Sequence, residues 1–144
     1  MSSVRVLDWV GVVVVAGCAA LAGLLELFLV PLYTGSTLVP IAVLLSLASN
    51  TYLPRLSGAI VPSIAAAALP FVAWLVVIVG IGLTTRPEGD VVLPGGGGVQ
   101  WVGYGVLLGG ALAATVTLVL SAPAPRRPRG ATPPGRAQAA IDPR

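Results

Sequence analysis

The side chain best placed to do chemistry in this chain is Glu26, the one acidic residue well inside an apolar run. It lies in the segment DWVGVVVVAGCAALAGLLELFLVPLY, residues 8–33. The apolar part, from Trp9 to Val30, is about 22 residues long, enough to cross a hydrocarbon core of about 30 Å as a helix. A carboxylate inside such a segment is costly, so it is a candidate for binding a proton or a cationic substrate.

Spacing and depth predict the surroundings of Glu26. Small residues precede it at intervals of three or four, at Ala16, Ala19 and Gly23, so we expect it on the packed face of a helix. It lies about four residues, or roughly 6 Å, from the end of the segment. At that depth the expected partners are Gln100, Trp101, Tyr104 and Arg86. Two interpretations stay open: a structural anchor tying the first helix to the fourth, which we favour, or the proton and substrate site of a transporter.

A second polar group consists of Ser46, Ser49 and Asn50, with Ser63, Thr115 and Thr117 expected at similar depth. The antiparallel course of the segments places this group in the membrane leaflet opposite Glu26, so we expect two separate polar regions. The hydroxyl and amide groups could line a cavity. We favour interhelical hydrogen bonds, a common use of such residues in membrane helices.

Several kinds of chemistry are excluded by composition. The chain has no His and a single Cys, Cys18, so it offers no Cys/His metal site, no internal disulfide and no imidazole base. We therefore expect no enzyme activity and no cofactor. Cys18 ends a sequence resembling a lipobox, but the apolar residues that follow favour a packing residue in a retained helix. Four consecutive glycines, residues 95–98, favour a flexible hinge over a phosphate-binding loop.

The elements that position these residues are predicted by composition and hydropathy. The chain has 144 residues, 56% hydrophobic and 9% charged, and a mean hydropathy of +0.97, which indicates an integral membrane protein. We predict an all-α fold with a transmembrane domain over residues 1–120 and four helices at about 9–30, 38–53, 59–83 and 99–120. Turns are expected at 34–37 and 54–58. Pro70 should kink the third helix and free a backbone carbonyl that a neighbour must satisfy.

Small residues predict where the helices approach each other. Gly105, Gly109 and Ala113 form a small-xxx-small series on the fourth helix, and Ala19 and Gly23 mark the first. We favour packing within the bundle; a homodimer face is the alternative.

Arginine placement predicts the topology. Four spans put Arg5, Arg55 and the five arginines of the tail on one side, against Arg86 on the other. By the positive-inside rule both termini are cytoplasmic, in a multi-pass protein of a bacterial plasma membrane. The tail, residues 121–144, is rich in Pro, Ala and Arg and is predicted to be disordered. Arg126, Arg127 and Arg129 either contact anionic lipid headgroups or act as a topology anchor, and no nucleic-acid partner is expected.

The chain resembles two groups of membrane proteins. Four hydrophobic segments and an acid in the first helix, Glu26, are similar to the small multidrug resistance transporters. That resemblance implies a first-helix glutamate shared by proton and cationic drug, although Glu26 lies further outward. In whole-chain layout, with Ala- and Val-rich helices and an Arg/Pro tail, the chain resembles uncharacterised four-span membrane proteins of actinobacteria. That resemblance implies no activity. We expect a non-enzymatic accessory or scaffold role, with the lipid bilayer and either another membrane protein or a second copy of the chain as partners.

Overall fold

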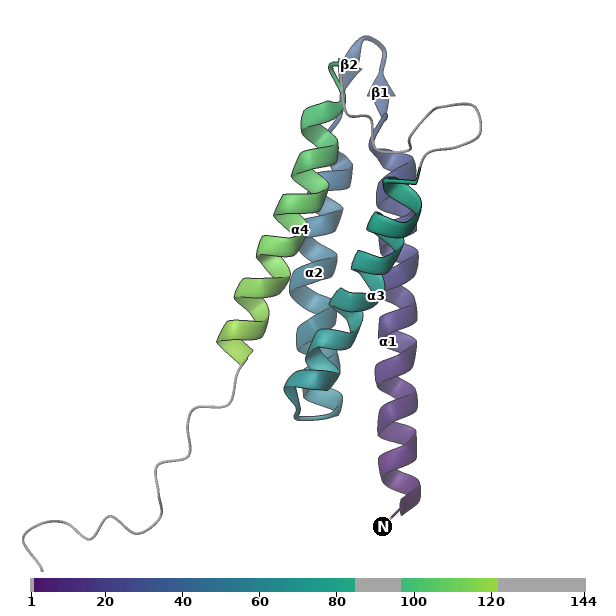
Figure 1. Ribbon diagram of the computed structural model, residues 1–144, viewed down its shortest axis with the longest axis vertical. Helices are drawn as coiled ribbons and strands as arrows, with labels where there is room; N and C mark the ends of the chain where they lie inside the picture. Colours follow the sequence, from purple (N-terminus) through teal and green to yellow (C-terminus); the bar gives the residue numbers. More distant parts are fainter. Residues whose placement is uncertain (1, 85–96, 122–144) are drawn as a thin grey trace, which may run out of the picture.

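Antiparallel helices make up most of the protein. The computed structural model describes residues 2–84 and 97–121. Within these ranges the chain forms four helices: α1 (Ser2–Leu29), α2 (Ile41–Ile60), α3 (Ile64–Gly82) and α4 (Gln100–Ser121). The chain reverses direction at each connection, so the N-terminal end of α1 and the C-terminal end of α4 lie at the same end of the molecule (Figure 1). The helical fold predicted from the sequence is confirmed for these residues.

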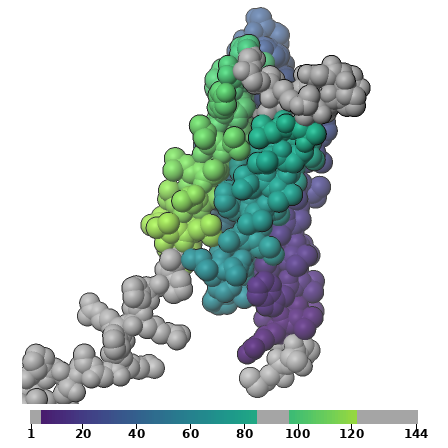
Figure 2. All heavy atoms as spheres, in the orientation of Figure 1, coloured from purple at the N-terminus to yellow at the C-terminus, as the bar shows by residue number. Residues whose placement is uncertain are grey.

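The four helices do not contact one another equally. α1 packs against α3 and α2, and α4 packs mainly against α2. α3 runs obliquely, so that its lower end lies near α2 and its upper end near α1 (Figure 1). Figure 2 shows the face on which the atoms of α3 and α4 lie beside each other. α2 is therefore the helix that joins α4 to the rest of the bundle.

The connection between α1 and α2 is a short β-hairpin rather than a simple turn. α1 ends at Leu29, two residues before Pro31, as expected for a residue that cannot continue a helix. Strands β1 (Tyr33–Thr34) and β2 (Thr37–Leu38) then pair antiparallel, with Tyr33 opposite Leu38. Gly35 supplies the left-handed backbone conformation of the turn, with φ of 64°. This hairpin extends beyond the end of α1 (Figure 1).

The boundary between the second and third helices differs from the prediction. The predicted end of the second helix at residue 53 and the turn at 54–58 are wrong, because α2 continues through Pro54 to Ile60. Proline removes one intrahelical hydrogen bond, but packed neighbours let a helix continue through it. The chain turns instead at Val61, Pro62 and Ser63, so the third helix begins at Ile64 rather than near residue 59.

One predicted consequence of Pro70, a freed backbone carbonyl that a neighbour satisfies, is confirmed. Pro70 lies inside α3 and lacks the N–H that would reach the carbonyl of Ala66 four residues earlier. The Ser57 hydroxyl of α2 donates a hydrogen bond to that carbonyl over 2.7 Å, and both residues are buried. A side chain on the neighbouring helix therefore satisfies the group that the proline frees.

Three of the helices are long and apolar enough to cross a membrane: Arg5–Leu29 within α1, Ile64–Gly82, and Gln100–Ser121. α2 has 20 residues, but its apolar character is interrupted by Ser46, Ser49, Asn50 and Arg55. The first predicted helix, at about residues 9–30, corresponds to α1, which starts well before Trp9. The fourth predicted helix, at about residues 99–120, agrees with α4 to within one residue at each end. Of the predicted tail, residues 121–144, Ser121 is instead the last residue of α4, and the remainder lies outside the described residues.

Candidate functional site: the Glu26 cluster

The carboxylate of Glu26 lies fully buried where α1, α2 and α3 meet. Its Oε1 accepts a hydrogen bond from the Ser49 hydroxyl of α2 at 2.9 Å. Its Oε2 accepts one from the Trp74 indole Nε1 of α3 at 2.7 Å. Both oxygens are therefore engaged, and both donors are neutral. We call Glu26, Ser46, Ser49, Asn50 and Trp74 the Glu26 cluster.

The prediction that Glu26 and Ser49 lie in opposite leaflets is wrong, and the length of α2 explains why. That prediction assumed a second helix that ends at residue 53, with Ser49 near its inner end. α2 instead runs from Ile41 to Ile60, so Ser49 lies near its middle. Glu26 lies about 4.5 Å below the end of α1, and Ser49 about 12 Å below the start of α2, at 1.5 Å per residue. Side chains also lean toward the N-terminus of their own helix, so these two lean toward each other.

α2 connects Glu26 to α4 through Ser46. The Ser46 hydroxyl is buried and donates to the backbone carbonyl of Val106 on α4 at 2.9 Å. The Ser46 carbonyl accepts from Asn50 Nδ2 at 3.1 Å and lies 3.2 Å from the Ser49 hydroxyl. Two of the residues predicted as interhelical hydrogen-bonding groups therefore bond between helices, Ser46 to α4 and Ser49 to Glu26 of α1. The Asn50 side chain bonds within α2.

Close packing by glycines holds Trp74 in place. A Cβ atom at Gly23 of α1 would lie 3.0 Å from Trp74 Cδ1. A Cβ at Gly110 of α4 would lie 2.6 Å from Trp74 Cζ2 and would also collide with Ser46 Oγ. Phe71 stacks beside the indole, with ring centroids 5.9 Å apart. Trp74 thus contacts α1 at a position where a methyl group would be tight, and α4 at a position where it would collide.

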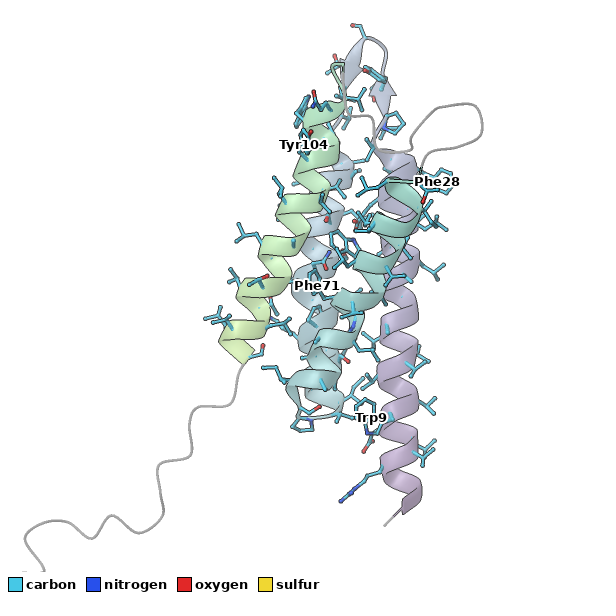
Figure 3. The ribbon with its side chains drawn as sticks, viewed as in Figure 1. Trp9, Phe28, Phe71 and Tyr104 are labelled. Atoms are coloured by element: carbon cyan, nitrogen blue, oxygen red, sulfur yellow. The ribbon has the colours of Figure 1, made fainter. Side chains whose placement is uncertain are left out.

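The partners predicted for Glu26 lie elsewhere. Trp101 and Tyr104 are each more than half exposed on α4, and Gln100 donates to the Tyr104 hydroxyl at 3.2 Å. Tyr104 lies toward the hairpin end of α4 (Figure 3). Arg86 lies outside the described residues. The expected tie from the first helix to the fourth is wrong in its direct form, because Glu26 bonds to α2 and α3 and reaches α4 through Ser46.

The small residues predicted at helix contacts are found within the bundle. Ala19 and Gly23 lie on the buried face of α1 that carries Glu26. A Cβ at Gly105 would lie 2.8 Å from Val43, and one at Gly109 would lie 3.5 Å from Leu47, so both glycines face α2. Ala113, one turn further, is half-buried. The intramolecular interpretation of this series is therefore supported by the contacts of its glycines.

Two residues of this site, Trp74 and Gly110, were not predicted from the sequence. Trp74 is a tryptophan near the middle of the most apolar helix, away from the interfaces where this residue is common. A buried indole N–H needs an acceptor, and Glu26 is the strongest acceptor in the apolar segments. The sequence could therefore have predicted a hydrogen bond between Trp74 and Glu26. Gly110 follows Gly109 directly, but the small-xxx-small pattern selects only the first of the two.

Metal ligation finds no support in this region. No group of three or more His, Cys, Asp or Glu side chains lies together among the described residues. The arginines predicted to contact lipid headgroups, Arg126, Arg127 and Arg129, lie outside residues 2–84 and 97–121.

Comparison with other proteins adds no relative. No protein-family model matches the chain, and no curated protein and no solved structure matches it.

Proposed function

We propose that this chain is a multi-pass membrane protein of a bacterial plasma membrane that acts as a non-enzymatic accessory or scaffold protein. All four helices would span the bilayer, with both termini in the cytoplasm. The observation that carries the proposal is the closed packing of the Glu26 cluster. A carboxylate with both oxygens bonded, beside an indole held between two glycines, is the arrangement expected of a structural tie.

The distribution of polar groups supports membrane insertion, including that of α2. The buried face of α2 repeats every three or four residues and carries Ser46, Asn50 and Ser57, whereas Leu44 and Leu56 are exposed. A soluble helix has the opposite polarity. Polar side chains turned inward and apolar ones outward are expected where lipid is the solvent. α2 is therefore proposed as the fourth span, with its polar residues shielded by its neighbours.

Topology can be tested with reporter fusions at three positions: the N-terminus, the C-terminus and the loop at residues 84–98. Two cytoplasmic signals at the termini and an external signal in the loop are expected. An external signal at the C-terminus with a cytoplasmic N-terminus would instead mean an odd number of spans, and α2 would then lie outside the bilayer.

Proton-coupled transport is a second candidate, favoured by one specific observation. The Ser49 hydroxyl has one proton and two acceptors, Glu26 Oε1 at 2.9 Å and the Ser46 carbonyl at 3.2 Å. When Glu26 is charged, Ser49 donates to it. When Glu26 is protonated at Oε1, the carboxyl donates to Ser49, and Ser49 turns to Ser46. The Trp74 indole only donates, so Oε2 stays an acceptor in both states. The cluster can hold either protonation state.

Proteoliposomes separate the two candidates. Purified protein is reconstituted with a pH-sensitive dye inside, and candidate organic cations are added outside under a proton gradient. A scaffold gives the same proton flux as empty liposomes, for both the natural protein and Glu26→Gln. A cation-dependent flux that Glu26→Gln abolishes would establish the transporter and refute the scaffold. Partner association, measured by crosslinking and co-purification, should survive Glu26→Gln in the scaffold case.

A further inference from the structure

A second polar feature lies at the end of the molecule opposite the hairpin, where α2 ends, α3 begins and α4 ends. A hollow of about 400 Å³ opens there. Its lining residues come from all three helices and from the turn between α2 and α3: Arg55, Gly58, Ala59, Pro62, Ser63, Ile64, Ala67 and Ser121. This hollow is distinct from the Glu26 cluster and contains none of its residues.

The walls of the hollow are fixed by one hydrogen bond between α2 and α3 and by the N-cap of α3. Ser57, beside Gly58, donates to the Ala66 carbonyl of α3, and the Ser63 hydroxyl accepts from the Ala66 N–H at 3.1 Å. Gly58 permits close approach, because a Cβ there would lie 3.3 Å from Ala67 Cβ. α4 packs mainly on α2, so its last residue, Ser121, borders the hollow without filling it. The space is therefore part of the folded bundle.

The lining combines one cation with apolar and hydroxyl groups. Arg55 is the charged side chain among the lining residues, its side chain is exposed, and no acidic residue of the described part of the chain lines the hollow. Ile64, which lines the hollow, is 54% exposed, and Leu56, which follows Arg55 in the sequence, is 51% exposed. Arginine binds phosphate through paired N–H groups. An anionic group attached to a hydrocarbon chain matches both parts of this surface.

We propose that this hollow binds the phosphate group of an anionic phospholipid, with Arg55 contacting the phosphate and the acyl chain lying along Ile64 and Leu56. The inference rests on the proposed membrane insertion, which puts this end at the cytoplasmic headgroup level. Tyr52, exposed one turn before Arg55, is a residue type enriched at that level. Bound lipid would fill the gap between the end of α4 and the start of α3.

The test is lipid binding by the full-length protein, measured by native mass spectrometry with phosphatidylglycerol and phosphatidylcholine. Phosphatidylglycerol should bind more tightly to the natural protein. Arg55→Gln should weaken that binding about tenfold, since a charge-assisted contact is lost. Arg5→Gln is the matched control, because Arg5 is exposed near the same end of the molecule and its removal changes the net charge equally. It should change binding less than about twofold.

A filling variant tests the cavity separately from the charge. Ala59 is exposed and lines the hollow, so Ala59→Leu should occupy the space, keep Arg55 and weaken phosphatidylglycerol binding to a similar degree. Equal losses for Arg5→Gln and Arg55→Gln, or no loss for Ala59→Leu, would overturn the site. If inorganic phosphate or glycerol phosphate fully displaces phosphatidylglycerol, the ligand of the hollow is a free phosphate rather than a lipid. Liposome flotation distinguishes the failures: a chain that does not float refutes membrane insertion, and one that floats but binds lipid without selectivity refutes the site alone.

Discussion

The Trp74 indole restricts what can replace Glu26, because a buried N–H requires an acceptor. Glu26→Gln keeps an amide oxygen for the indole and an amide N–H for Ser49, whose own proton can move to the Ser46 carbonyl. Its cost should stay below about 1 kcal/mol. Glu26→Leu leaves the indole N–H without an acceptor and should cost about 1–3 kcal/mol. Reversible unfolding in detergent measures the difference. Equal stability of the two variants would show that the hydrogen bond to Trp74 contributes nothing.

Adjacent glycines on α4 offer a matched pair for testing the packing around Trp74. Gly110→Ala places a methyl group 2.6 Å from the indole ring and against the Ser46 hydroxyl, so it should destabilise the fold by about 1–3 kcal/mol. Gly109→Ala meets Leu47 at 3.5 Å, an ordinary contact, and should be neutral or slightly stabilising. Thermal unfolding in one detergent compares them. A neutral Gly110→Ala would mean that α4 can move away from α3 at no cost.

Sequence predicted the face of Glu26 better than its partners. Helical periodicity placed Ala16, Ala19, Gly23 and Glu26 on one side of a helix, and these residues are buried. Periodicity within one helix says nothing about the relative height of two helices. The depth of Ser49 also depends on where α2 ends, and α2 continues to Ile60 rather than to the predicted residue 53. Ser49 and Trp74 therefore could not be placed beside Glu26 by counting residues from segment ends.

The joint between α2 and α3 combines a proline and a serine on different helices. If Ser57 is needed because Pro70 frees the Ala66 carbonyl, the two residues should be coupled. Ser57→Ala alone should cost about 1–3 kcal/mol, because it leaves a buried carbonyl unpaired. In a Pro70→Ala background the restored N–H bonds to Ala66, and the same substitution should cost less than about 0.5 kcal/mol. A double-mutant cycle of unfolding free energies measures this coupling; strict additivity would contradict it.

Local sequence signals predicted the end of α1 but not the end of α2. Pro31 ended α1 as predicted, because apolar sequence gives way to a polar turn just after it. Pro54 did not end α2, although Arg55, Ser57 and Gly58 follow it. Ser57 and Gly58 have tertiary roles instead, one bonding to Ala66 and the other admitting Ala67. Residue types that favour turns were used here for helix contact, and local sequence does not separate the two uses.

At the scale of the whole molecule, the polarity of the surface connects fold and proposed function. Large apolar side chains are exposed along all four helices, whereas Glu26, Ser46, Asn50, Ser57 and Thr117 are buried. In water this arrangement would expose an apolar surface far larger than monomeric soluble proteins carry. In lipid it places each polar group where a neighbouring helix can satisfy it. The Glu26 cluster then sets the relative positions of the helices, since the hydrophobic effect does not act between them there.

The native cysteine provides a direct test of this polarity. Cys18, predicted to be a packing residue, instead lies in the middle of α1 with its side chain exposed, so an inserted α1 turns it toward acyl chains. A charged maleimide does not enter the hydrocarbon core, so it should leave Cys18 unlabelled in intact membranes but label it after denaturation in SDS. The matched control is Cys18→Ala with Ser36→Cys, which moves the thiol to the exposed tip of the hairpin and should label from outside. Rapid labelling of Cys18 in intact membranes would show that this face of α1 meets water.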